Sequence, residues 1–267
     1  MDEILAGAEW LLQHLNDAKV RIFDIRSPLE YSTGHIPNAV LIRYERIVDF
    51  DTSRPYMDVA SKESIEQLLS GKSVSNDTTV VIYGDRGGAS ATRLFWTLEL
   101  YGAKVRLLDI PFSIWKARGY PTTRDIPKPV IAKFVAINHF KDFRVTSDYI
   151  ASKIGKPATI LVDTRNPEEF EGLVVSGPRA GRIPGSINLP WQEGVGDGKI
   201  FKETRELARL FESRGISKDK EIVCYCHVGE RASHTFIALR LSGYPNVRIY
   251  DRSFAEWGSK PELPVEP

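Results

Sequence analysis

Cysteine is nearly absent from this chain of 267 residues, which contains only Cys224 and Cys226. The two lie two positions apart on one expected strand, and we expect no disulfide between them. A chain of this length, with 42% hydrophobic residues, can bury a sizeable core without covalent crosslinks. The cysteine content therefore predicts a reducing, cytoplasmic location.

The sequence also lacks long apolar runs and a marked excess of charge. No stretch approaches the about 18 apolar residues that indicate a membrane span. The N-terminus has no basic leader before a long apolar run, so we expect no signal peptide. The formal net charge is +1, which gives no indication of binding to nucleic acid or to an acidic membrane surface.

What the chain does contain is a repeat of itself. The segments Val20–Asn38 (VRIFDIRSPLEYSTGHIPN) and Ile160–Ser186 (ILVDTRNPEEFEGLVVSGPRAGRIPGS) share the same order of features. An apolar strand is followed by Asp-x-Arg, then by Pro-x-Glu with an aromatic residue, then by a Gly-x-Ile-Pro turn. The second copy carries an insertion between Gly172 and Arg179. A repeat of this length predicts two homologous domains.

The later parts of the two copies match as well. Val80–Tyr83 (VVIY) parallels Ile222–Tyr225 (IVCY), and each is followed by a loop that contains glycine and then by a helix-like run. Each copy then reaches a tryptophan, Trp115 or Trp257, at an offset of 142 residues (257 − 115). Because the two tryptophans occupy equivalent positions in the two copies, we interpret both as core residues.

The repeat predicts the domain organisation and the fold class. We expect an α/β protein of two tandem domains, residues 1–124 and 143–267, with a linker over 125–142 that opens with Pro127 and Pro129. Short apolar runs alternate with helical patterns in each copy, which predicts a parallel sheet flanked by helices on both faces. In such folds the chemistry lies at the carboxyl ends of the strands.

A loop with reactive potential follows the strand Ile222–Tyr225. Backbone N–H groups between a strand end and a helix start can form an anion site, together with the positive end of the helix. A cysteine at that position has its thiolate stabilised and can become a nucleophile. The loop consists of Cys226, His227, Val228, Gly229, Glu230 and Arg231. Cys224 lies within the apolar strand, and we interpret it as a small buried side chain.

Four motifs together resemble the two-domain rhodanese family of thiosulfate and 3-mercaptopyruvate sulfurtransferases. They are Asp163-x-Arg165, Gly181-Arg182-Ile183-Pro184-Gly185, Cys226-x-x-Gly229-x-Arg231 and the segment from Tyr250-Asp251 to Trp257-Gly258. The resemblance covers nearly the whole chain. It implies two rhodanese-like domains, an inactive first one and a catalytic second one that forms a cysteine persulfide. The loop of the first copy, Gly84–Ser90, agrees because it contains no cysteine and is one residue shorter between the tyrosine and the Ala-Ser pair.

The resemblance implies a transfer of sulfur through Cys226. We expect a small anionic donor and an acceptor that is cyanide, a thiol or a protein cysteine, with no cofactor. Arg231 favours thiosulfate as the donor, whereas the Cys-Gly-Ser-Gly loop typical of mercaptopyruvate enzymes is absent. 3-Mercaptopyruvate stays open as the alternative donor, as does a carrier module that moves sulfur without catalysis.

Two other chemistries fit the loop less well. Cysteine phosphatases use Cys-x5-Arg, whereas only four residues separate Cys226 from Arg231. The shorter loop predicts a narrower anion site, which suits a sulfur atom better than a phosphoryl group. A metal site is not expected, because the loop lacks the paired ligand spacing of zinc sites and no second ligand cluster follows.

Several further residues are candidates for the site or its support. Arg179 and Arg182 are candidate contacts of the donor anion, and His227 and Glu230 are candidates for a substrate role. Arg182 takes the place of a histidine that the first copy keeps as His35, which we interpret as structural. The remaining set, Asp163, Arg165 and Glu169, is repeated as Asp24, Arg26 and Glu30 in a copy without a nucleophile, so it is interpreted as a structural network.

Overall fold

The computed structural model describes residues 4–128 and 130–267, so Pro129 of the predicted linker and the first three residues lie outside the described ranges. The chain divides into two compact units, which we treat separately. The first unit comprises Met1–Asp49, Val59–His139 and Asp197–Ile200. The second comprises Phe50–Asp58, Phe140–Gly196 and Phe201–Pro267. Each unit therefore consists of one repeat copy plus a short segment from the other.

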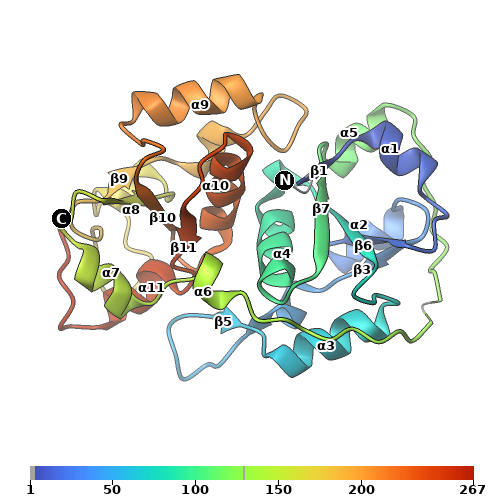
Figure 1. The fold of residues 1–267 in the computed structure, drawn as a ribbon, viewed down its shortest axis with the longest axis horizontal. Coiled ribbons are helices and arrows are strands. Elements are labelled where there is room, and N and C mark those ends of the chain that lie inside the picture. The colour runs from blue at the N-terminus through green and yellow to red at the C-terminus, as the bar shows by residue number, and fades with distance from the viewer. Residues whose placement is uncertain (1–3, 129) are drawn as a thin grey trace. The chain divides into compact units, whose positions relative to one another are not determined.

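A five-stranded parallel sheet forms the centre of the first unit (Figure 1). Its order is β1 (Leu5–Ala6), β7 (Lys104–Leu108), β6 (Thr79–Tyr83), β2 (Val20–Asp24) and β3 (Ala39–Leu41). The helices are α1 (Ala8–Gln13), α2 (Pro28–Thr33), α3 (Lys62–Gly71), α4 (Ala89–Leu100) and α5 (Phe112–Ala117), with 3-10 turns at Tyr44–Arg46 and Arg86–Gly88. A short pair of strands, β4 (Val48–Asp49) and β5 (Asp58–Val59), lies outside this sheet.

The second unit repeats this design around four parallel strands. Their order is β11 (Val247–Ile249), β10 (Glu221–Tyr225), β8 (Thr159–Asp163) and β9 (Ile187–Asn188). The helices are α6 (Phe140–Phe143), α7 (Ser147–Lys153), α8 (Pro167–Phe170), α9 (Thr204–Ser213), α10 (Glu230–Leu241) and α11 (Ser253–Ser259), with a 3-10 turn at Trp191–Gly194. None of the helices in the described ranges has the length and hydrophobicity that crossing a bilayer requires.

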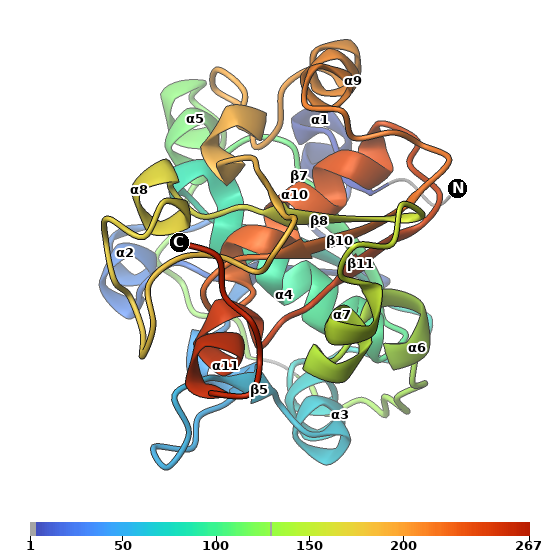
Figure 2. The ribbon, with the colours of Figure 1, turned by 90° about the vertical axis from the view of Figure 1, so that its left-hand side faces the viewer.

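Helices cover both faces of the sheet in the second unit (Figure 2). Val223 and Tyr225 point to one face and pack with Phe254 and Trp257 of α11, because alternate strand residues share a face. α10 packs against β10 and β11 from the other side. The predicted α/β architecture, with parallel sheets flanked by helices, is confirmed.

The Asp-x-Arg motif has the same structural role in both units. In the first, Arg26 Nε donates to Asp24 Oδ1 over 3.0 Å and Arg26 Nη2 donates to the carbonyl of Gly34 over 2.9 Å. In the second, Arg165 makes the same bonds to Asp163 at 3.0 Å and to the carbonyl of Gly181 at 2.8 Å. Each buried pair ties its strand end to the following turn, which confirms the interpretation of this pair as structural.

The two echoed tryptophans are also equivalent. Trp115 and Trp257 are both fully buried. Trp115 Nε1 donates to the carbonyl of Pro121 over 2.9 Å, and Trp257 Nε1 donates to the carbonyl of Pro264 over 2.7 Å. Each indole thus satisfies its polar atom while filling the core, as the sequence predicts.

Candidate active site

Cys226 directly follows β10, which lies between β11 and β8 in the sheet of the second unit. Its backbone N–H donates to Ser253 Oγ over 3.0 Å, and its carbonyl accepts from the N–H of Phe254 over 3.1 Å. The start of α11 therefore fixes the start of the loop. Ser253 itself has φ 54°, a left-handed conformation that is uncommon for a residue with a side chain.

The thiol of Cys226 is held by the loop that it opens. The backbone N–H of Gly229 donates to Cys226 Sγ over 3.0 Å. Gly229 has φ 83° and caps the N-terminus of α10, so its glycine identity permits the turn that aims this N–H at the sulfur. Because Cys226 is only 1% exposed, protein donors and the helix end must take the place of water in stabilising a charged sulfur.

Arg231, at the far end of the loop, forms a two-point ion pair with Glu169. Nη1 lies 2.5 Å from Oε2 and Nη2 lies 3.0 Å from Oε1. Burial disfavours the charge on each partner, but their mutual hydrogen bonds prevail: the pKa of Glu169 falls to about 2 and that of Arg231 rises above its usual value. The neighbouring Cys226 also raises the pKa of Arg231. A fixed positive charge is thus kept beside the sulfur.

Glu169 links this ion pair to the N-terminus of its own helix, α8, and to the insertion. The backbone N–H of Asn166 donates to its Oε2 over 3.2 Å, and Ser176 Oγ donates to its Oε1 over 3.2 Å. The sequence grouped Glu169 with the structural motif, and its contact with Arg231 was missed. Both copies combine a Pro-x-Glu glutamate with an arginine in the later loop, so the sequence carried no signal specific to this contact.

His227, the second loop residue, is half-buried. Its Nδ1 is buried and has no hydrogen-bond partner among the residues that the structure describes. Burial, reinforced by the charge of Arg231, lowers the pKa of the imidazole. The insertion passes beside the ring, since a Cβ on Gly177 would lie 3.6 Å from His227 Cε1. Val228 and Glu230 complete the loop and are half-buried.

Arg179 is directed at the end of the chain. Its guanidinium donates to the carbonyls of Gly258, Leu263, Trp257 and Lys260 over distances of 2.7 to 3.0 Å. These bonds occupy all three of its nitrogens. The contacts favour a role in anchoring the C-terminal segment, and contact between Arg179 and a donor stays a prediction.

Arg182 and His35 occupy equivalent positions in the structures of their units as well as in the sequence repeat. His35 stacks on Tyr31 with ring centroids 3.8 Å apart, and Arg182 lies 4.5 Å above the ring of Phe170. Each also pairs its backbone with the following tail, His35 with Thr123 and Arg182 with Glu266. His35 is therefore structural, as predicted. The contacts of Arg182 favour the same role, and its binding of a donor stays a prediction.

The first unit provides an internal comparison for the cysteine loop. Its helix α4 is capped by Gly88 at φ 83°, the same value as Gly229 before α10. Counted to these equivalent glycines, four residues follow Tyr83 but only three follow Tyr225. The loop without cysteine is thus one residue longer before its cap. Counted to the Ala-Ser pair, it is one residue shorter, as the sequence predicts, because two residues separate Gly229 from Ala232 whereas none separates Gly88 from Ala89.

The same comparison identifies the place of Ser253 in the first unit. The N–H of Phe112 donates to the carbonyl of Gly84 over 3.0 Å, as that of Phe254 does to the carbonyl of Cys226. The residue before Phe112 is Pro111, which has no side-chain hydroxyl. A serine at this position therefore accompanies the cysteine in one copy only.

Cys224 differs from Cys226 in its surroundings. It lies within β10, and both cysteines are free thiols. Burial, followed by the proximity of Cys226, raises the pKa of Cys224 well above its usual value. Within residues 4–128 and 130–267, no group of three or more histidine, cysteine, aspartate or glutamate side chains is placed to hold a metal ion.

Comparison with known proteins identifies the family of the chain. The family model described as Rhodanese-like domain matches residues 7–118 and 146–260. A protein of Thermus thermophilus named "Sulfur carrier protein TtuD" is 37% identical over 98% of this chain and 96% of its own length. A protein of Haloferax volcanii named "Putative thiosulfate sulfurtransferase" is 35% identical over 99% of this chain and 96% of its own.

A solved structure supports the fold alone. The anaerobic ergothioneine biosynthesis enzyme from Chlorobium limicola, solved with trimethyl histidine, superposes with a TM-score of 0.87. The two are 24% identical, and the match covers 98% of this chain and 70% of the enzyme.

Proposed function

Because the chain belongs to the rhodanese family and carries two rhodanese-like domains, we propose that it is a sulfurtransferase that moves a sulfane sulfur through a persulfide on Cys226. The observation that carries this proposal is the hydrogen bond of 3.0 Å from the Gly229 N–H to Cys226 Sγ. A backbone donor that already points at the sulfur stabilises the thiolate before the reaction and the charged persulfide after it.

The proposed reaction has two steps, each a displacement at sulfur. The Cys226 thiolate attacks the outer sulfur of thiosulfate, the bond between the two thiosulfate sulfur atoms breaks, and sulfite leaves with the bonding electrons. Cyanide or a thiolate then attacks the outer sulfur of the persulfide, and Cys226 leaves as the thiolate. The sum needs no external oxidant or reductant and divides one exchange into two easier steps.

Thiosulfate is the proposed donor because Arg231 keeps a positive charge beside the sulfur. Glu169 offsets much of that charge, which supports a site that is only weakly cationic. The relative named for thiosulfate supports the same donor. The relative named as a sulfur carrier supports a protein as an acceptor. His227, Val228 and Glu230 are proposed to contact the substrates. 3-Mercaptopyruvate remains the alternative donor.

A direct test measures three activities on one preparation. Thiocyanate formation from thiosulfate and cyanide is expected, together with a gain of about 32 Da on Cys226 after thiosulfate alone, the mass of one sulfur in the persulfide scheme. Turnover of 3-mercaptopyruvate and of a phosphate monoester is measured alongside. Cys226→Ser should lose both thiocyanate formation and the adduct, whereas Cys224→Ala should keep them. Hydrolysis of the phosphate ester without thiocyanate formation would refute the proposal.

A further inference from the structure

A small pocket in the first unit gathers cationic side chains away from the cysteine loop. It has a volume of about 250 Å³ and is lined by Arg21, Lys72 and Lys128. Arg21 is the second residue of β2. The pocket therefore lies where this strand starts, whereas chemistry in parallel α/β sheets is found at the carboxyl ends of strands.

These three cations have no anionic partner within the described ranges, 4–128 and 130–267. The hydrogen bond made by the Arg21 side chain runs from Nη1 to the carbonyl of Val20 over 3.1 Å. One carboxylate lines the pocket, that of Asp17, and it accepts the backbone N–H of Lys19 over 2.8 Å. Three cations against one carboxylate leave a surplus of positive charge around a concave space.

A buried hydroxyl completes the lining. Ser73 is 8% exposed and has φ 62°. Its Oγ is buried, and no atom of the described residues hydrogen-bonds to it. Leaving such a group unsatisfied costs about 1–3 kcal/mol, and the left-handed backbone adds strain. Ser73 lines the pocket, and a rotation about its Cα–Cβ bond would turn this donor towards a ligand oxygen.

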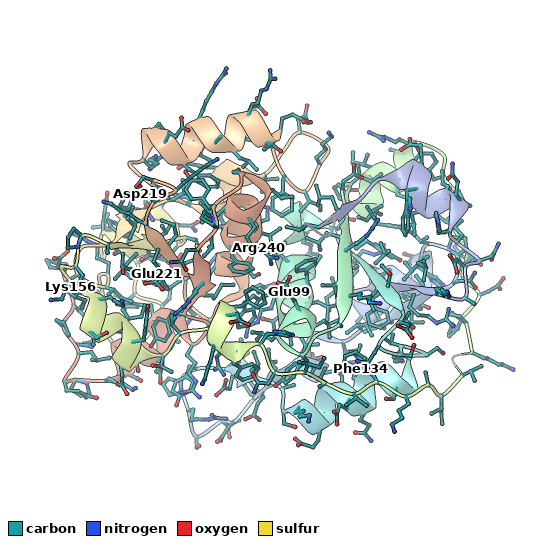
Figure 3. All side chains as sticks on the ribbon, viewed as in Figure 1. Glu99, Phe134, Lys156, Asp219, Glu221 and Arg240 are labelled. Carbon is teal, nitrogen blue, oxygen red and sulfur yellow. The ribbon has the colours of Figure 1, made fainter. Side chains whose placement is uncertain are left out.

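The linker between the two repeats closes one side of the pocket. It runs beside α3, where the N–H of Ala132 donates to the carbonyl of Ser70 over 3.0 Å and the N–H of Phe134 donates to Ser70 Oγ over 3.0 Å. Phe134, labelled in Figure 3, is buried there. These contacts hold the linker close to Lys72 and Ser73, which directly follow α3.

Part of this arrangement has a simpler cause. Lys72 caps the C-terminus of α3, where the helix dipole attracts a cation. The dipole explains neither the cationic Arg21 nor Lys128, which reaches the pocket from the linker. It also does not explain the unsatisfied hydroxyl of Ser73.

We propose that this pocket binds a small tetrahedral oxyanion with two negative charges. Arginine and lysine donate charge-assisted hydrogen bonds to such oxygens, and Ser73 Oγ would donate one more. The volume lies below the about 300–1,000 Å³ of pockets for larger organic ligands, which favours an inorganic anion. Phosphate, sulfate and thiosulfate share this chemistry, and the site is independent of the function proposed for Cys226.

The test titrates the full-length protein with each anion separately. Calorimetry and amide NMR are recorded at constant ionic strength, and the thiosulfate arm uses Cys226→Ser so that no persulfide forms. Saturable binding is expected, with amide shifts concentrated at Arg21, Lys72 and Ser73. The anion that binds most tightly identifies the source.

Variants separate a built site from general attraction to positive charge. Ser73→Ala keeps the Cβ and the backbone strain, and we expect about tenfold weaker binding, since a hydrogen bond to a charged group is lost. Its melting temperature without anion should stay unchanged or rise. Lys128→Glu should weaken binding further, whereas the matched control Lys133→Glu, an exposed residue of the same linker, should keep it.

Two results would overturn the proposal. One is the absence of saturable binding for all three anions at millimolar concentrations. The other is binding that Ser73→Ala and Lys128→Glu leave at the affinity of the unaltered protein.

Discussion

Arg231 and Glu169 join the two ends of the candidate site through a pair of hydrogen bonds, 2.5 Å and 3.0 Å long. One residue closes the cysteine loop and the other belongs to α8. The first unit has a weaker counterpart, in which Arg86 lies 3.7 Å from Glu30 and is largely exposed. The shorter ion pair therefore occurs in the unit that contains the nucleophile, and the equivalent pair of the first unit serves as an internal control.

Glu169→Gln is expected to reduce both stability and sulfur transfer. The variant leaves the partly buried guanidinium of Arg231 without its carboxylate, which costs about 1–3 kcal/mol at a site of this burial. Loss of the fixed loop geometry should lower kcat/KM by about tenfold. Urea unfolding and the thiocyanate assay measure the two effects.

The control is Glu30→Gln, at the equivalent position of the first unit. Exposed ion pairs contribute about 0–1 kcal/mol, so this variant should match the unaltered protein in activity. Equal losses in the two variants would contradict a special role for the pair of Arg231 and Glu169.

The same pair predicts a dependence of stability on acid. Glu169 has a folded pKa of about 2 against 4.5 for the unperturbed group. A lowered pKa contributes stability that is fully present above the unfolded value and is lost as the pH falls towards the folded one. The difference in unfolding free energy between the unaltered protein and Glu169→Gln should therefore be constant near neutral pH and shrink below about pH 4.5. A difference that grows on acidification would show the opposite sign.

Ser253→Ala should impair the reaction more than the fold. The variant removes the acceptor of the Cys226 N–H and the donor to the carbonyl of Tyr250. The loop then keeps its backbone bonds to Phe254 and Ala255 but loses this side-chain anchor, and we expect kcat to fall by about tenfold through misplacement of the sulfur. KM for thiosulfate should change less than kcat, because a misplaced sulfur affects the reacting geometry more than the binding of the donor.

Ser259→Ala is the matched control, since Ser259 donates to the carbonyl of Glu256 in the same helix. It should leave both kcat and KM unchanged. A kcat for Ser253→Ala equal to that of the unaltered protein would limit the serine to a general structural role.

Gly181→Ala tests the close approach of the C-terminal tail. A Cβ there would lie 2.0 Å from the carbonyl oxygen of Glu266, at φ +94°. Such a contact cannot form without moving backbone, so the loss of stability should exceed about 2 kcal/mol. Gly185→Ala has φ +72° but nothing within 4 Å, so it should show only the strain of the left-handed backbone, about 1 kcal/mol. Equal effects on thermal unfolding would show that the tail does not constrain Gly181.

Much of the fold could be predicted from the sequence because each repeat copy can be compared with the other. The buried pair of Asp163 and Arg165 and the core position of Trp257 followed from their repetition in a copy without a nucleophile. The nucleophile and its capping Gly229 followed from the order of strand, cysteine, glycine and helix. Contacts between side chains far apart in the sequence could not be predicted from it. Glu169 and Arg231 are 62 positions apart, and no local sequence pattern indicates which of several arginines a glutamate contacts.

Hydrophobic periodicity, repetition and loop composition are properties of neighbouring residues, so they were enough to predict the two-domain α/β architecture, the family and the single candidate nucleophile. The contacts that hold the loop became known from the folded chain alone. The fold directed Arg179 to the carbonyls of the tail, stacked Arg182 on Phe170, and placed Ser253 beneath the backbone of Cys226. Long arginine side chains can reach in many directions, and packing against distant segments selects among them.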